Sequence, residues 1–228
     1  MDQTTVVLVP MYNEASVVGT VVAELREHFA TIVCVDDGSS DDSASVARTA
    51  GALVLRHPVN LGQGAALQTG FDLLSRRPGT GLTVTFDADG QHRVADAVAM
   101  VEASRRTGVD VLLGSRALGS TTDQPLARRL LLAAALRYSR WSTGLALTDT
   151  HNGLRVLSRR AIGAIRLRQP GMAYATELES AITQSRLSWA EHPTTIAYTE
   201  YSRRKGQSNL NAFNIVYDLT SQRLRSAL

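Results

Sequence analysis

The stretch Phe86-Asp87-Ala88-Asp89-Gly90-Gln91-His92 follows an apolar run that begins at Leu82. The run predicts a buried strand, and two carboxylates follow it with one residue between them. Side chains at positions i and i+2 of an extended chain lie on the same side, so Asp87 and Asp89 can both bind one divalent cation. Such cations prefer oxygen ligands and leave positions open for the phosphates of a substrate. The stretch therefore indicates a metal-assisted reaction on a phosphorylated substrate.

Two earlier apolar runs also end in polar residues: Val6-Val7-Leu8-Val9-Pro10-Met11-Tyr12-Asn13-Glu14 and Ile32-Val33-Cys34-Val35-Asp36-Asp37-Gly38-Ser39-Ser40-Asp41. In open α/β sheets, ligands bind outside the carboxyl ends of the strands. We therefore expect the three segments to meet at one edge of a sheet. Taken singly, Asp36, Asp37 and Ser39 would more simply cap the next helix, and Pro10 would end its strand. The three motifs in order favour a shared binding site instead.

This ordered set resembles glycosyltransferase family 2, and within it the dolichyl-phosphate-mannose-synthase-like branch of polyprenyl-phosphate glycosyltransferases. The resemblance covers nearly the whole chain. It continues through four later segments: Asn60–Ala66, Gly114–Arg116, Asp149–Arg155 and Ser202–Ser208. It implies a nucleotide-sugar donor and an α/β chain with a single-domain glycosyltransferase A fold, whose Rossmann-like, mostly parallel sheet has helices on both faces.

The apolar periodicity independently predicts alternating strands and helices up to Gly114, and a mixed region after Arg116. After a first strand from Val6, the expected strands are Thr31–Asp36, Leu53–Arg56, Leu82–Asp87, Val109–Gly114, Gly153–Ser158 and Glu191–Tyr198. The expected helices are Glu14–Phe29, Asp41–Gly51, Gly64–Ser75, Val94–Thr107, Leu126–Ser142, Ala175–Ser185 and a last helix from Leu210. No Gly-x-Gly-x-x-Gly opens the first helix, which disfavours dinucleotide binding.

The composition is that of one globular domain over residues 1–228, with 44% hydrophobic and 20% charged residues. We expect residues 1–116 to bind the nucleotide sugar. Residues 117–228 are expected to bind the acceptor and to end in a helix. The single cysteine, Cys34, cannot form an internal disulfide, so we expect it to be a core residue in a reducing cytoplasm.

The net charge of +3 comes from scattered basic pairs, and aromatic residues make up only 5% of the chain. A nucleic-acid-binding protein would cluster its basic residues with aromatics between them, so nucleic acid is not an expected partner. The start, Met1-Asp2-Gln3, lacks the basic and apolar regions of a signal peptide, and the apolar run Leu130–Leu136 is too short to span a membrane. We expect a cytoplasmic protein, and the sequence predicts no particular oligomeric state.

A peripheral contact at the inner face of the plasma membrane is the alternative location. Apolar residues recur every third position in the last expected helix, at Leu210, Phe213, Val216 and Leu219. Such stripes more often face a protein core than a membrane surface.

The resemblance also implies roles for individual residues. The donor's base and ribose would lie among Pro10, Tyr12, Glu14 and Asp37, and the nucleotide sugar would also be bound by Asp36, Gly62 and Asp87. Mg²⁺ or Mn²⁺ would be bound by Asp87, Asp89 and Gln91, with His92 as a neighbour. The diphosphate or an acceptor phosphate would be bound by Arg116, Arg128, Arg129, Arg204 and Lys205. Relatives commonly carry a lysine between Gly62 and Gly64, where this chain has the neutral Gln63.

Asp89 and Arg116 are also catalytic candidates, and two further acidic residues, Asp149 and Glu177, are candidates for the catalytic base. A hydroxyl acceptor needs a base to take its proton, whereas a phosphate acceptor is already an anion. The resemblance implies an inverting transfer to a polyprenyl phosphate. One alternative acceptor is a hydroxyl of a glycan or small molecule. A function of another class is that of a non-catalytic nucleotide-binding or receiver-like α/β module. A receiver-like domain needs an acceptor aspartate after its third strand, and this chain has no aspartate near Arg56, which disfavours that function.

Overall fold

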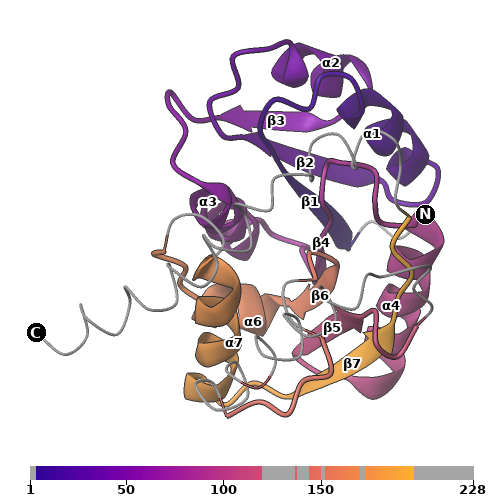
Figure 1. The fold of residues 1–228 in the computed structure, drawn as a ribbon, viewed down its shortest axis with the longest axis vertical. Helices are drawn as coiled ribbons and strands as arrows, with labels where there is room; N and C mark the ends of the chain where they lie inside the picture. Colours follow the sequence, from indigo (N-terminus) through magenta and orange to yellow (C-terminus); the bar gives the residue numbers. More distant parts are fainter. Residues whose placement is uncertain (1–3, 120–136, 138–143, 150–151, 170–172, 198–228) are drawn as a thin grey trace, which may run out of the picture.

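The computed structural model describes residues 4–119, 137, 144–149, 152–169 and 173–197. They form a seven-stranded sheet in the order β3-β2-β1-β4-β6-β5-β7 (Figure 1). The strands are β1 (Thr5–Met11), β2 (Thr31–Asp36), β3 (Leu53–Arg56), β4 (Leu82–Thr85), β5 (Val111–Ser115), β6 (Arg155–Ser158) and β7 (Trp189–Pro193). The helices are α1 (Val18–Arg26), α2 (Ser43–Thr49), α3 (Gln63–Arg76), α4 (Val94–Thr107), α6 (Arg159–Ala164) and α7 (Tyr174–Gln184).

The sheet is mostly parallel, as predicted. Strand β1 pairs in parallel with β2 and β4, β2 pairs in parallel with β3, and β5 pairs in parallel with β7. Strand β6 runs antiparallel between β4 and β5. One edge of the sheet therefore collects the ends of β1, β2, β4 and β5 together with the start of β6.

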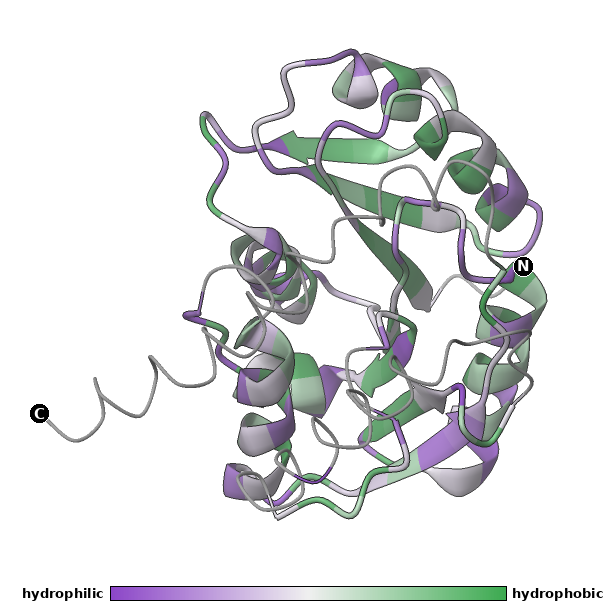
Figure 2. Ribbon diagram, viewed as in Figure 1, coloured by the Kyte–Doolittle hydropathy of each residue, from purple (hydrophilic) through white to green (hydrophobic). Residues whose placement is uncertain are grey.

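Both faces of the sheet are covered by helices. On β1, Val7 and Val9 pack in a core with α1, α2 and α4, whereas Val6 and Leu8 pack in a second core with α3, α6 and α7. Burial on both faces explains why β1 and β2 are continuous apolar runs, which are green in Figure 2. Cys34 is a buried residue of the first core, and its burial raises the pKa of its thiol to about 12.

Strands β2 and β3 and helix α4 have the predicted bounds, but several other elements begin or end elsewhere. Helix α1 begins at Val18 rather than at Glu14. The residues before it are bound to the loop after β2, and Asn13 has a left-handed backbone with φ 54°. Helix α2 begins at Ser43 rather than at Asp41, because the Asp41 carboxylate accepts the Ser43 N–H at 3.0 Å.

Four strands, β4, β5, β6 and β7, are shorter than predicted. Strand β4 ends at Thr85 and leaves Asp87 in the following loop, β5 begins at Val111, and β6 begins at Arg155. Strand β7 ends at Pro193, although Ile196 forms an isolated bridge with His92. Asp87, predicted at the end of a strand, therefore lies on a loop, which can adopt geometries that a strand cannot.

Helix α6 was not predicted. It begins after Ser158, whose hydroxyl accepts the Ala161 N–H at 3.1 Å, but its six residues are too few to show a helical period. The helix expected at Leu126–Ser142 lies outside the described residues apart from Arg137, and the helix expected from Leu210 lies outside them entirely. Among the described helices, none is long and apolar enough to cross a bilayer.

Close packing of α3 on β1 gives the first prediction. A Cβ added to Gly70 would collide with the Leu8 side chain, whereas a Cβ added to Gly163 in α6 would meet open space. We expect Gly70→Ala to lower the free energy of unfolding by about 1–3 kcal/mol, because the packed core must move. We expect Gly163→Ala to raise it by up to about 1 kcal/mol through helix propensity. Urea unfolding measures both, and equal changes would contradict the packing.

Candidate functional site

The loops after β1, β2 and β4 surround a cavity of about 470 Å³. The strand order reverses at β1, since β2 lies on one side of it and β4 on the other. Ligand sites of open α/β sheets form at such reversals. Seven residues predicted to bind the donor or the metal line the cavity: Pro10, Tyr12, Glu14, Asp37, Gly62, Asp87 and Asp89. The structure therefore brings together residues from all three motifs.

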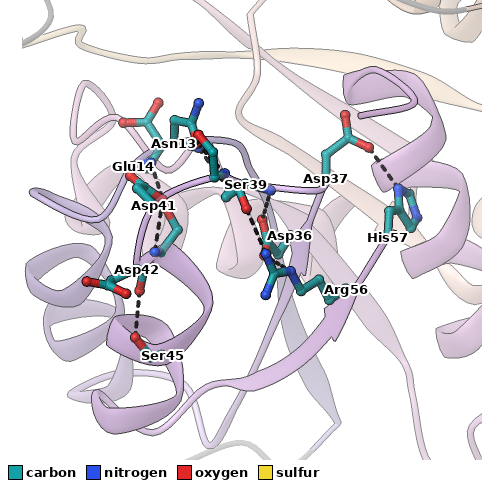
Figure 3. Close-up of polar contacts among 12 residues, drawn as sticks. Asn13, Glu14, Asp36, Asp37, Ser39, Asp41, Asp42, Ser45, Arg56 and His57 are labelled. Atoms are coloured by element: carbon teal, nitrogen blue, oxygen red, sulfur yellow. Dashed lines mark hydrogen bonds and ion pairs between the residues drawn. The ribbon is translucent and has the colours of Figure 1, made fainter. Parts of the chain in front are cut away.

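Serines and an asparagine tie the loop after β1 to the loop after β2 (Figure 3). The Asn13 N–H donates to Ser39 Oγ at 2.9 Å, and Asn13 Oδ1 accepts the Ser40 N–H at 2.9 Å. The Glu14 N–H donates to Ser43 Oγ at 2.7 Å. These bonds fix the backbone on either side of Glu14 and so hold its segment at the cavity.

Asp36 lies apart from the cavity-lining residues, although it was predicted with the donor-binding set. Its side chain is fully buried, and its Oδ2 lies 3.1 Å from Arg56 Nε. Its Oδ1 accepts the Ser39 N–H at 3.0 Å. The Asp36 carboxylate thus braces the loop after β2 against β3, as Figure 3 shows.

Asp37 instead holds the loop that leads into α3. Its Oδ1 accepts from His57 Nδ1 at 2.8 Å and from the Leu61 N–H at 2.9 Å, and its Oδ2 accepts from the Gly62 N–H at 2.7 Å. A carboxylate only accepts, so His57 Nδ1 carries the proton. His57 Nε2 lies 2.9 Å from Thr69 Oγ1 on α3. Sequence reasoning missed His57, because a single histidine after a strand has no distinctive pattern.

Asp87 is enclosed by groups from three elements. Gln63 Nε2, at the start of α3, donates to Oδ1 at 3.1 Å, and His92 Nε2 lies 3.0 Å from Oδ2. A Cβ added to Gly153, just before β6, would collide with the Asp87 carboxylate. The Gly153 carbonyl in turn accepts from Thr85 Oγ1 at 2.7 Å, which holds it beside β4. The neutral Gln63, noted in the sequence as a departure from the family pattern, therefore contacts an expected metal ligand.

The two carboxylates of the Asp-Ala-Asp motif differ electrostatically. Burial opposes ionisation of Asp87, but the His92 hydrogen bond, the positive charge of Arg155 and the Gln63 hydrogen bond together lower its pKa. Burial and the negative charge of Asp87 raise the pKa of Asp89 to about 6, although the Gln91 N–H donates to Asp89 Oδ1 at 3.0 Å. The two carboxylates thus repel each other across the site.

A divalent cation would relieve this repulsion, and the oxygen donors present suit Mg²⁺ or Mn²⁺. The described residues contain no cluster of three or more histidine, cysteine, aspartate or glutamate side chains with a metal-binding arrangement. The candidate ligands therefore remain those predicted from the sequence, the Asp87 and Asp89 carboxylates and the Gln91 amide.

Arg155 is a second residue that sequence reasoning missed as part of the site. It pairs with Thr85 of β4 and Leu113 of β5, and only 4% of it is exposed. Its guanidinium carbon lies 5.7 Å from the centre of the Tyr174 ring. The positive charge of Arg155 lies near enough to the Asp87 carboxylate to lower its pKa.

Arg116 and Asp149 face each other. Arg116 Nε and Nη2 donate to Asp149 Oδ2 and Oδ1 at 2.7 and 2.6 Å, and the Arg116 backbone N–H donates to Oδ2 at 2.8 Å. Glu191 Oε1 accepts the Asp149 N–H at 3.3 Å and the Thr148 N–H at 2.9 Å. The two predicted catalytic residues thus form a bidentate ion pair at the end of β5.

Glu177, the other predicted base, lies in the first turn of α7 and outside the cavity lining. Its Oε2 accepts the Arg168 N–H at 2.7 Å and the Gln169 N–H at 2.9 Å. The predicted phosphate-binding residues Arg128, Arg129, Arg204 and Lys205 lie outside the described residues.

The segment after β7 returns to the loop after β4. The Ala197 N–H donates to the Gln91 carbonyl at 2.9 Å, and the Thr195 N–H donates to Asp96 Oδ2 at 2.7 Å. The last described residue therefore lies beside the Asp-Ala-Asp loop.

Solved structures share this fold. Glucosyl-3-phosphoglycerate synthase from Mycobacterium tuberculosis in complex with phosphoglyceric acid matches with a TM-score of 0.68 and 20% identity, over 96% of this chain and 79% of that chain. The same enzyme in complex with Mn²⁺, uridine-diphosphate and glucosyl-3-phosphoglycerate matches with a TM-score of 0.65 and 20% identity, over the same shares. These matches confirm the predicted glycosyltransferase A fold.

Relatives found by sequence give more specific information about the family than the shared fold does. The chain is 26% identical to UDP-N-acetylglucosamine--dolichyl-phosphate N-acetylglucosaminyltransferase from Methanococcus voltae, over 100% of this chain and 99% of that protein. It is 31% identical to polyprenol monophosphomannose synthase from Mycolicibacterium smegmatis, over 93% of this chain and 83% of that protein. Residues 6–165 match the family Glycosyl transferase family 2. A non-catalytic receiver-like module is thereby excluded, and the chain belongs to glycosyl transferase family 2 as a glycosyltransferase.

Proposed function

We propose that the chain transfers a sugar from a nucleoside-diphosphate sugar to a polyprenyl phosphate, with a divalent metal and with inversion at the anomeric carbon. The observation that carries this proposal is the pair Asp87 and Asp89, which opens into the cavity at the sheet reversal. The names of the dolichyl-phosphate and polyprenol relatives support the class of acceptor.

The cavity binds the donor along the ends of three neighbouring strands. Asp37 accepts a hydrogen bond from the base, Tyr12 stacks on it, and Glu14 accepts from the ribose hydroxyls. Tyr12 is 43% exposed, which leaves its ring accessible to a ligand. The diphosphate then lies toward Asp87 and Asp89, two strands away.

Asp87, Asp89 and Gln91 would hold Mg²⁺ or Mn²⁺, which supplies positive charge that stabilises the departing nucleoside diphosphate. The chain's own residues prepare this site before a donor binds. Gln63 and His92 hold the Asp87 carboxylate from both sides, and the absence of a side chain at Gly153 leaves room for it. Held in this way, the carboxylate loses little conformational freedom when a cation binds.

Both candidate bases already accept hydrogen bonds from other groups of the chain, which supports a phosphate acceptor. The Asp149 carboxylate accepts three hydrogen bonds from Arg116, and Glu177 Oε2 accepts two from backbone N–H groups. A hydroxyl acceptor would need one of these carboxylates to take a proton, whereas a phosphate monoester attacks as an anion. Its oxygen reaches the anomeric carbon from the face opposite the diphosphate, which inverts that centre.

A lipid phosphate also requires contact with a membrane surface, at the inner face of the plasma membrane for a cytoplasmic enzyme. The basic residues Arg203, Arg204 and Lys205 follow the described segment that ends beside Gln91. We propose that they bind the diphosphate or the acceptor phosphate by charge-assisted hydrogen bonds.

Loss of one metal ligand tests the metal requirement. We expect Asp89→Asn to lower transfer by at least about 100-fold, because the developing charge on the diphosphate loses its counter-ion. Asp72→Asn on α3, whose carboxylate bonds only Gln68 in the described structure, is the matched control and should keep its activity. Product formation from a radiolabelled donor measures both. Full turnover in excess EDTA would exclude metal dependence.

The room left by Gly153 gives a test that needs no turnover. We expect Gly153→Ala to displace the Asp87 carboxylate and to weaken Mn²⁺ binding by roughly tenfold, as changes beside metal ligands usually do. The fold should survive, because the colliding group is the end of a side chain. Calorimetric titration with Mn²⁺ measures the affinity, and Gly163→Ala is the control for the same added methyl group. Unchanged Mn²⁺ affinity in Gly153→Ala would remove Asp87 from the metal site.

The acceptor is tested with a short-chain polyprenyl phosphate in detergent. We expect sugar transfer to it, and we expect Glu177→Gln to stay within about tenfold of the parent enzyme, since no proton must be removed. Transfer only to a free hydroxyl acceptor, abolished by Asp149→Asn or Glu177→Gln, would instead decide for a hydroxyl-glycosylating enzyme.

A further inference from the structure

Residues 194–197 follow β7 and lie beside the start of α4 and the loop before it (Figure 1). The Ala197 N–H donates to the Gln91 carbonyl at 2.9 Å, and Ile196 forms an isolated antiparallel bridge with His92. Ile196 is buried, whereas Ala197 is exposed. The hydrogen bond to Gln91 thus comes from the backbone at position 197, whose side chain faces solvent.

Gln91 and His92 each contact one carboxylate of the Asp-Ala-Asp motif. The Gln91 N–H donates to Asp89 Oδ1 at 3.0 Å, and His92 Nε2 lies 3.0 Å from Asp87 Oδ2. The Gln91 backbone is therefore held at its N–H by Asp89 and at its carbonyl by Ala197. The segment after β7 thus supports both carboxylates, in each case through the residue that contacts the carboxylate.

Contacts from two sides hold residues 194–197 in place. Toward β5, the buried Thr194 donates its N–H to the Ser115 carbonyl at 3.0 Å, and its Oγ1 accepts from Asn152 Nδ2 at 3.0 Å. Toward α4, the Thr195 N–H donates to Asp96 Oδ2 at 2.7 Å. A hydrogen bond from a backbone N–H to a carboxylate is charge-assisted and stronger than one between neutral groups. Asp96 therefore ties the segment firmly to the first turn of α4.

We propose that Asp96 is a positioning residue of the metal site. It holds the segment after β7, and that segment holds Gln91 and His92 against the two carboxylates. The inference rests on the proposed role of Asp87 and Asp89 as metal ligands. Asp96 lies outside the described cavity lining, so the proposal gives it no contact with the cation.

Calorimetric titration of the full chain with Mn²⁺, in the absence of a donor, tests this role. We expect Asp96→Ala to weaken Mn²⁺ binding by roughly threefold to tenfold, because the loop that bears Asp89 loses part of its support. Asp96→Asn keeps an oxygen that can accept the Thr195 N–H, so its Mn²⁺ affinity should stay within about twofold of the parent. Equal weakening in both variants would assign the effect to the lost charge and would overturn the inference.

Asp110 offers a matched control at the other end of β7. Its Oδ2 accepts the N–H of Ser188, the residue before β7, at 2.9 Å, so it anchors the start of the strand as Asp96 anchors the segment after it. Asp110→Ala should lower the free energy of unfolding, which urea unfolding measures, and should leave the Mn²⁺ affinity unchanged. Equal loss of Mn²⁺ affinity in Asp110→Ala and Asp96→Ala would reduce the effect to general stability and would contradict the proposal.

Ala197 tests the same support if Asp96→Ala does not fold, as judged by circular dichroism. Proline has no N–H, so Ala197→Pro removes the donor to Gln91, whereas Ala197→Ser keeps that donor. We expect Ala197→Pro to weaken Mn²⁺ binding and Ala197→Ser to leave it unchanged. Parent-like affinity in Ala197→Pro would count against the inference.

Asp89→Asn separates this inference from the proposed function. If Asp89→Asn abolishes Mn²⁺ binding while Asp96→Ala and Ala197→Pro bind as the parent does, the metal site stands and the role of Asp96 is refuted. If the parent chain binds no Mn²⁺, or if Asp89→Asn binds it as the parent does, the proposed metal site and this inference are both overturned.

Discussion

Strand β6 runs antiparallel between β4 and β5, and the arrangement of the site depends on this reversal. In an antiparallel strand the start lies where its neighbours end. Gly153 and Arg155 therefore lie under the loop after β4 rather than at the opposite edge of the sheet. The reversal allows the Asp87 carboxylate to fit against a residue without a side chain, with the buried cation of Arg155 two residues further along the chain.

This placement also explains how two carboxylates can remain so close together. Asp87 receives two side-chain hydrogen bonds and the field of Arg155, all of which favour its ionised form. Burial of Asp89 and the negative charge of Asp87 outweigh the one backbone N–H that Asp89 accepts, so the pKa of Asp89 rises to about 6. The site thus holds one firmly ionised carboxylate, that of Asp87, and one whose negative charge a cation would stabilise, that of Asp89. A site with this asymmetry is better suited to bind a cation reversibly, together with a diphosphate, than to hold a permanent structural metal.

Much of this could be predicted from the sequence, because burial on both faces makes β1 and β2 plainly apolar and the parallel strands place their polar ends at one edge. Local turn chemistry limited the rest. The start of α1 was misplaced because Asn13 bonds serines 26 and 27 residues away, and no local pattern records such contacts. His57 and Arg155 were missed for the same reason, since each gains its role only when loops and strands distant in sequence come together. Asp36 and Asp37 are adjacent and chemically alike, yet alternation along an extended chain turns only Asp37 to the cavity.

The neutral side chain of Gln63 fits the charges around Asp87, which already include the positive charge of Arg155. Relatives that carry a lysine at the corresponding position place a cation beside the same loop, whereas here the Gln63 amide contacts Asp87 directly. Arg155 already supplies a buried positive charge on the other side of that carboxylate. A lysine at position 63 would add a second positive charge and compete with the metal for Asp87, because like charges in a poorly solvated site repel strongly. The amide holds the carboxylate without that competition. In the proposed reaction, the positive charge that the diphosphate needs would then come from the metal and from arginines elsewhere in the chain.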